Sequence, residues 1–137
     1  MRRANDKSQF TPFGLWIQEY VNENFSVTNL DYVIEDYKGK NVMMVEEKQN
    51  GGKVHTAQCL TFEVLDKALA KNAPIQGYTY WGFYVVQMPR GHTFIGPGVK
   101  LNGKPVTVEQ LQRHLNFEEQ IVEPHMFNWR KRHNKKY

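Results

Sequence analysis

The sequence predicts an α/β protein in which helices flank a mixed central β-sheet. Two runs rich in aromatic and β-branched residues, 28–37 and 41–49, are separated by a short turn, as in an antiparallel hairpin. A helical pattern follows at 55–71, and the next run, 78–88, is apolar on both faces, as in a central buried strand. Strands and helices in this order are typical of a sheet with helices packed on it.

Length and composition favour one compact domain. The chain has 137 residues, of which 40% are hydrophobic and 13% aromatic, and this is enough for a core. We expect a single domain over 1–128 and a basic tail over 129–137. No run approaches the roughly 18 apolar residues of a membrane span, residues 1–7 lack the apolar segment of a signal peptide, and Cys59 has no second cysteine to pair with. These features predict a cytoplasmic protein without a membrane partner.

The first helix begins near Thr11, which is a candidate N-cap followed by Pro12 at the first helical position. Apolar residues then recur with helical periodicity at Phe13, Trp16, Ile17, Tyr20 and Val21. We expect this stripe to pack on the sheet.

The hairpin turns at Lys38–Lys40, where we expect Gly39 to adopt a positive φ. If the turn is centred between Lys38 and Gly39, residue 31 lies opposite residue 46. Strand alternation then places Glu46 and Lys48 on one face of the sheet and Glu47 on the other.

The second helix carries apolar residues in a stripe that we expect to face the core, at Ala57, Leu60, Val64, Leu65, Ala68 and Leu69. Gln58 and Phe62 lie one turn apart and off that stripe, so they are free to face the strand ends. Cys59 is interpreted as a small buried residue.

Two shorter elements are expected after the buried strand. A long loop over 89–98 is followed by Asn102-Gly103, the strongest short hairpin signal in the chain. Thr107 with Gln110 forms a capping box that predicts a short helix containing Leu111 and Leu115.

Asp31, Glu46 and Lys48 have the chemistry of a magnesium-dependent phosphodiesterase centre. Mg²⁺ is usually held by one or two carboxylates together with waters and substrate phosphate oxygens, so Asp31 and Glu46 would suffice. Lys48 would stabilise charge on the phosphate or assist deprotonation of the attacking water. The backbone carbonyl of Glu47 is a further candidate ligand. The alternative interpretation is that these are solvated strand residues.

With these residues the chain resembles the PD-(D/E)xK nuclease superfamily, which has the restriction-endonuclease-like fold. The resemblance spans about residues 10 to 88. It implies a core order αβββαβ or a shortened version, and cleavage of DNA, less often RNA, with Mg²⁺ or Mn²⁺. Asp31, Glu46 and Lys48 match the motif, although Asn29-Leu30 stand where the namesake proline would be.

The resemblance extends to weaker positions. Gln58 and Phe62 are similar to the Gln-x-x-x-Tyr element of some exonuclease-like branches, with phenylalanine in place of tyrosine. Glu19 on the first helix matches a glutamate that sometimes reaches the metal site. The chain is also similar in size to uncharacterised phage or prophage proteins, which implies a bacterial or phage-infected cell.

The net charge of +4 is concentrated at the two ends of the chain. The tail supplies candidate nucleic-acid contacts at Trp129, Arg130, Lys131, Arg132, Lys135 and Lys136. Basic blocks bind phosphate backbones without reading sequence, and Trp129 could stack on an unpaired base. A merely solubilising tail is the alternative.

Other chemistries find less support. The histidines at 55, 92, 114, 125 and 133 have no paired spacing, and there is no phosphate-binding glycine loop with its lysine. Together with the metal-site chemistry of Asp31, Glu46 and Lys48, the resemblance to PD-(D/E)xK nucleases implies a metal-dependent nuclease acting on DNA. A ribonuclease, or a non-catalytic nucleic-acid-binding or phage assembly protein with the same fold, remains an alternative, and a homodimer is left open.

Overall fold

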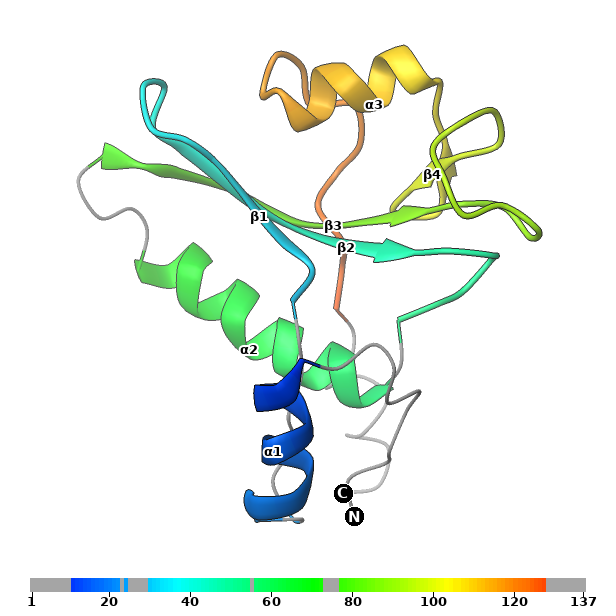
Figure 1. Cartoon of the computed structure of the whole chain (residues 1–137). Coiled ribbons are helices and arrows are strands. Elements are labelled where there is room, and N and C mark those ends of the chain that lie inside the picture. Colours follow the sequence, from blue (N-terminus) through cyan, green and yellow to red (C-terminus); the bar gives the residue numbers. More distant parts are fainter. Residues whose placement is uncertain (1–10, 23, 25–29, 55, 73–76, 128–137) are drawn as a thin grey trace, which may run out of the picture.

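The computed structural model describes residues 11–22, 24, 30–54, 56–72 and 77–127 (Figure 1). Within this part of the chain the elements are α1 (Pro12–Tyr20), β1 (Tyr32–Asp36), β2 (Asn41–Lys48), α2 (Thr56–Asn72), β3 (Thr79–Gln87), β4 (Lys100–Leu101), β5 (Lys104–Pro105) and α3 (Val108–Leu115). No helix in the described ranges is both long enough and apolar enough to cross a membrane.

The five strands form one mixed sheet in the order β1-β2-β3-β4-β5. β1 and β2 are antiparallel, whereas β2 and β3 are parallel and are connected through α2. β4 and β5 continue the sheet with antiparallel pairing beyond β3. The expected α/β class with a mixed sheet flanked by helices is therefore confirmed, and so is the central position of the strand at 78–88.

The register of the first hairpin agrees with the prediction. Tyr32 pairs with Val45 and Asp36 with Asn41, so Asp31, which precedes β1 by one residue, lies opposite Glu46. The turn itself differs, because Lys40 rather than Gly39 takes the positive φ, at 60°. Glycine is needed at position 39 because the backbone there lies close to the Asp36 side chain. A Cβ atom there would clash with the Asp36 carboxylate, which accepts the Gly39 backbone N–H at 2.9 Å.

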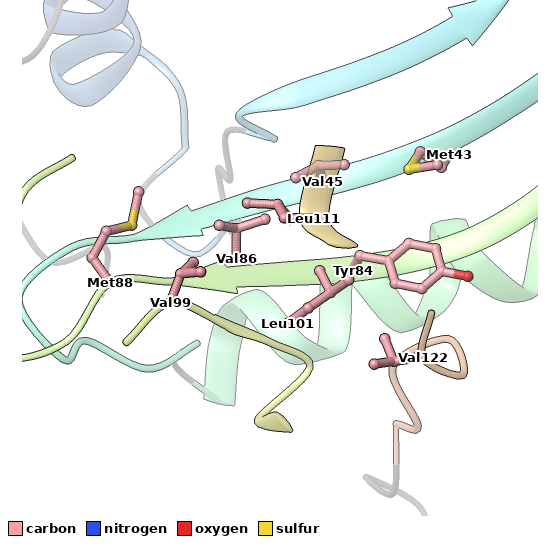
Figure 2. Packing of buried hydrophobic residues seen from close by; sticks show 9 residues of the cluster. All are labelled: Met43, Val45, Tyr84, Val86, Met88, Val99, Leu101, Leu111 and Val122. Carbon is pink, nitrogen blue, oxygen red and sulfur yellow. The ribbon is translucent and has the colours of Figure 1, made fainter. Parts of the chain in front are cut away.

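Helices cover both faces of the sheet (Figure 1). One face, here called the α3 face, carries the larger buried cluster, which Figure 2 shows: Met43, Val45, Tyr84, Val86, Met88, Val99, Leu101, Leu111 and Val122. The opposite face, here called the α2 face, carries a smaller cluster of Met44, Phe62, Phe83 and Val85. Alternate residues of β2 and β3 thus point into two separate cores, as strand alternation requires.

α2 packs on the sheet through a different stripe from the one predicted. Phe62 is fully buried and its ring lies 4.7 Å from that of Phe83, whereas Val64, Leu65 and Leu69 are 68%, 41% and 39% exposed. The expectation that the apolar periodicity marks the inner face of this helix is therefore wrong. An aromatic contact with the sheet decides which side of α2 faces inward.

α1 forms as predicted but does not pack as predicted. The Thr11 hydroxyl accepts the Gly14 backbone N–H at 3.1 Å, which confirms the N-cap. Phe13, Trp16 and Tyr20 are nevertheless mainly exposed, and no residue of α1 is buried. The expected packing of this stripe on the sheet is wrong.

The C-terminal elements follow their local signals. Asn102 and Gly103 both have positive φ, 50° and 79°, and connect β4 to β5 in the predicted hairpin. Thr107 and Gln110 form both hydrogen bonds of the capping box at the start of α3. Their local sequence is sufficient because each turn or cap is completed by groups only a few residues apart.

Candidate functional site

The three predicted site residues gather on the α2 face of the sheet, at the carboxyl end of β2. Residues 44, 46 and 48 alternate with the buried Met43 and Val45 of the α3 face, so Glu46 and Lys48 share the face covered by α2. Asp31 joins them because it lies opposite Glu46 in the hairpin.

Backbone hydrogen bonds hold the two carboxylates next to each other. The Asp31 N–H donates to Glu46 Oε1 at 3.2 Å. In return, the Glu47 N–H donates to Asp31 Oδ2 at 2.8 Å. Glu46 therefore accepts an N–H from the residue that precedes β1, and Asp31 accepts an N–H from β2. This reciprocal pair fixes the spacing of two groups that would otherwise repel each other.

Lys48 and Gln58 complete the cluster. Lys48 Nζ lies 3.4 Å from Glu46 Oε2 and donates to Gln58 Oε1 at 3.0 Å. Gln58 Nε2 in turn donates to Glu46 Oε2 at 3.5 Å. Gln58 stands in the first turns of α2, so the crossover helix brings an amide to the carboxylate–lysine pair. The sequence predicted this residue from its position off the apolar stripe of the helix and from the resemblance, and the structure brings it to the site.

Burial determines the electrostatics of the cluster. The Glu46 side chain is 2% exposed and that of Lys48 is 16% exposed. Burial raises the pKa of Glu46, and the charge of Asp31 raises it further. The hydrogen bond from Asp31 and the charge of Lys48 oppose these two effects. A nearby positive charge would therefore stabilise the ionised form of Glu46.

Glu47 faces the other way, as strand alternation predicts. Its carboxylate accepts hydrogen bonds from Tyr32 Oη and Gln49 Nε2, both at 3.4 Å. Its backbone N–H points toward Asp31, and the N–H and C=O of one strand residue lie on the same edge of the strand. The Glu47 carbonyl is therefore on the edge where Asp31 lies.

The donor set suits a hard cation that keeps part of its hydration. No group of three or more His, Cys, Asp or Glu side chains that could hold a metal occurs among the described residues. Asp31 and Glu46 instead offer two adjacent carboxylates. Mg²⁺ is commonly bound by one or two carboxylates with waters and substrate phosphates, whereas zinc sites usually need three or four protein ligands. The residues present fit Mg²⁺ or Mn²⁺.

The loop after β2 lies against Lys48, a contact that no motif in the sequence predicts. Gln87 pairs with Lys48 across β2 and β3, and its amide donates to the Gly52 carbonyl at 2.7 Å. A Cβ atom on Gly52 would lie 3.7 Å from Lys48 Cβ. The Gly51-Gly52 pair was a visible signal of close backbone approach, but it did not identify the side chain approached.

A second loop packs against the first at the carboxyl ends of β2 and β3. The Asn50 N–H donates to the His92 carbonyl and the Gly51 N–H to the Met88 carbonyl, both at 2.9 Å. These bonds bring Arg90 against Gly51. Exposed Lys53, Arg90 and His92 therefore belong to two linked loops near the carboxyl ends of β2 and β3.

The other candidate residues stand apart from the cluster. Glu19 is exposed on α1, and none of the hydrogen bonds that join Asp31, Glu46, Lys48 and Gln58 involves it. Phe62 is a core residue and does not face the strand ends as expected, because its ring packs on Phe83. The tail candidates, Trp129, Arg130, Lys131, Arg132, Lys135 and Lys136, lie outside the described residues.

Comparison with known proteins gives no match to this chain among family models, curated proteins or solved structures.

Proposed function

We propose that this protein is a metal-dependent nuclease that hydrolyses phosphodiester bonds in DNA. The observation that carries the proposal is the arrangement of Asp31, Glu46 and Lys48 on one sheet face, with Gln58 joined to both Glu46 and Lys48. Two carboxylates and a lysine are the groups that the resemblance implies, and the amide matches the glutamine of some exonuclease-like branches.

The topology supports the restriction-endonuclease-like fold as part of the proposal. A helix, an antiparallel strand pair, a crossover helix and a strand parallel to the second strand follow one another in α1, β1, β2, α2 and β3. This corresponds to a shortened αβββαβ core. The proposed site lies where the carboxyl end of β2 meets the start of α2.

In the proposed reaction Asp31, Glu46 and the Glu47 carbonyl would hold Mg²⁺ or Mn²⁺, which would supply a more acidic water and neutralise phosphate charge. Asp31 is kept in position by the Glu47 N–H, and Glu46 by Gln58 and the Asp31 N–H. Lys48 donates to a phosphate oxygen or assists removal of the proton from the attacking water. Water is supplied from the exposed side of Asp31.

The test is incubation of the purified protein with linear, branched and single-stranded DNA, and with RNA, in Mg²⁺, Mn²⁺ or chelator. We expect phosphodiester cleavage that depends on the metal and stops with chelator. If RNA is cleaved faster than DNA, RNA becomes the proposed substrate. Metal-independent cleavage would contradict the proposal, and nucleic-acid binding without cleavage would favour the non-catalytic binding or phage assembly alternative.

A further inference from the structure

One residue, Asn50, ties the loop between β3 and β4 to the loop after β2. Both loops lie at the end of the sheet toward which the arrows of β2 and β3 point (Figure 1). The Asn50 N–H donates to the His92 carbonyl at 2.9 Å, and the Asn50 side-chain oxygen accepts the Gly91 N–H. Asn50 has a φ of 54°, a left-handed conformation that asparagine adopts more readily than most residues. These two hydrogen bonds, here called the Asn50 clamp, hold the backbone next to Arg90 at two points.

The clamp places Arg90 beside the candidate site. The Met88 N–H donates to the Lys48 carbonyl at 2.9 Å, so the chain after β3 stays paired with the end of β2. Two residues further on, a Cβ atom added to Gly51 would lie 3.7 Å from Arg90 Cα. Gly52 makes the same close approach to Lys48, at 3.7 Å from its Cβ. The exposed Arg90 is therefore separated from Lys48 only by the glycine pair of the intervening loop.

Lys100 lies on the same face of the sheet as Lys48. Gln87 pairs with Lys48 on one side and with Lys100 on the other, so the three residues form one row across β2, β3 and β4. Val99 and Leu101 are buried in the α3-face cluster (Figure 2), so strand alternation turns Lys100 to the α2 face. Adjacent strands are about 4.8 Å apart, which separates the backbones of Lys48 and Lys100 by roughly 10 Å.

The segments that build this end of the sheet carry no negative charge. Residues 48–62 and 67–108 contain no aspartate or glutamate, whereas Arg90 and Lys100 are both exposed. The two carboxylates of the candidate site lie next to this surface, and a bound divalent cation would neutralise them. A surface with charges of one sign attracts a polyanion of the opposite sign.

We propose that Arg90, held by the Asn50 clamp, and Lys100 bind backbone phosphates of the nucleic-acid strand that the site cleaves. The planar guanidinium of arginine matches the oxygens of a phosphate in a bidentate contact, and lysine adds a compact positive charge. Phosphate contacts fix the position of a strand and carry no sequence information directly. Arg90 and Lys100 are therefore positioning residues that hold the backbone beside Lys48 without selecting a base sequence. The inference rests on the proposed function for the identity of the polyanion.

The test is the affinity of the whole chain for a fluorescein-labelled DNA duplex, measured by fluorescence anisotropy in chelator at several salt concentrations. Arg90→Gln and Lys100→Gln should each weaken binding and reduce the slope of log affinity against log salt by about 0.9, because each loses one phosphate contact. A duplex of unrelated sequence should show the same reductions. Lys104→Gln is the matched control and should bind as the wild type does. Lys104 is exposed on the next strand of the same hairpin, but it pairs with the buried Leu101 and so lies on the α3 face.

A second set of variants tests the clamp and the need for charge. Asn50→Gly keeps the positive φ and removes the oxygen that accepts the Gly91 N–H. We expect weaker binding with an unchanged salt slope, because the cation remains but its loop must be ordered when DNA binds. Arg90→Lys keeps the charge and should restore the slope that Arg90→Gln loses. Far-UV circular dichroism establishes that each variant is folded.

Binding is measured without cleavage, so the two proposals can fail separately. If the slope falls in Arg90→Gln and Lys100→Gln but no metal-dependent cleavage occurs, the phosphate contacts stand and the nuclease function is wrong. If cleavage occurs and the slope of either variant equals that of the wild type, the assignment of that residue is overturned and the nuclease function stands. An equal loss in Lys104→Gln would overturn both assignments, because the effect would then be one of net charge. Wild-type affinity in Asn50→Gly would overturn the role of the clamp.

Discussion

The carboxylate of Glu46 accepts the backbone N–H of Asp31 at 3.2 Å, across a hairpin in which the two acidic residues lie opposite each other. This hydrogen bond fixes a buried carboxylate beside a second carboxylate. Asp31 also adds to the effect of burial in raising the pKa of Glu46. The pair is therefore a place where a cation would relieve repulsion, and substitutions of either residue should alter metal binding.

Neutralising Asp31 should abolish activity and leave the fold intact. In Asp31→Asn the amide oxygen can still accept the Glu47 N–H, while the repulsion of Glu46 is lost. We expect metal-dependent cleavage to fall by about 100-fold or more, because a metal ligand is removed. The melting temperature without metal should stay equal or rise, since a like charge has been removed. Full activity with Mg²⁺ would contradict the assignment.

The adjacent glutamates should differ in their effects. Glu46→Gln should lose Mn²⁺ binding and reduce the cleavage rate by about 100-fold or more, whereas Glu47→Gln should keep most of both, because the Glu47 carboxylate is on the other face. Isothermal titration calorimetry with Mn²⁺ and a cleavage assay measure the two effects. Since the pKa of Glu46 is raised, protons compete with the metal, and Mn²⁺ affinity of the wild type should increase with pH through that pKa. Loss of metal binding in Glu47→Gln alone would show that the ligand is assigned to the wrong residue.

Removing the lysine should separate metal binding from turnover. Lys48→Ala eliminates a cation that pairs with Glu46, so Mn²⁺ affinity should be retained or increased. The cleavage rate should fall by about 10²–10⁴-fold if Lys48 acts on the water or the phosphate. Lys53→Ala is a suitable control, because Lys53 is an exposed lysine of the neighbouring loop. A rate loss explained entirely by weaker metal binding would remove the proposed role of Lys48.

His114 should make the fold sensitive to acid. Its ring is fully buried between those of Trp81 and Tyr84, Nδ1 accepts the Ile121 N–H at 3.1 Å, and Nε2 has no hydrogen-bond partner among the described residues. Burial lowers its pKa to about 4 from 6.5. Because the unfolded chain binds the proton more readily, the stabilisation is complete above pH 6.5 and is lost as the pH falls toward 4, to a total of about 3 kcal/mol.

The measurement is the free energy of unfolding in urea between pH 7.5 and 4.5, compared with His114→Asn. The variant keeps an acceptor for Ile121 and cannot titrate, so it should be less stable at pH 7.5 through poorer packing but should be less sensitive to acidification. Parallel pH curves for the two proteins would show that protonation of His114 does not contribute.

The basic tail should act on binding rather than catalysis. The slope of log affinity against log salt falls by about one for every phosphate that the protein no longer neutralises. Deletion of residues 130–136 should therefore weaken DNA binding and flatten its salt dependence, while the rate on saturating substrate stays the same. Filter binding at several salt concentrations gives the slope. An unchanged slope would leave the tail as a solubilising segment.

The elements that formed as predicted depend on neighbours in the sequence. The cap at Thr11, the capping box at Thr107 and the Asn102-Gly103 turn are each completed by groups a few residues apart. The register of the first hairpin is determined similarly, since the turn centre fixes which residues oppose each other. Asp31, Glu46 and Lys48 could therefore be assigned to one sheet face from the sequence, because strand alternation and hairpin pairing are local rules.

Tertiary structure decided which surfaces are covered. The periodicity of α2 favoured Leu65 and Leu69 as core residues, yet the helix is anchored by the contact between the Phe62 and Phe83 rings, with Gln58 toward Glu46 and the leucines partly exposed. α1 likewise has a clear apolar stripe that the described part of the chain leaves unburied. An apolar pattern in a sequence indicates that a face favours burial, but the partner that buries it is set by contacts between distant segments or between chains, which no local pattern encodes.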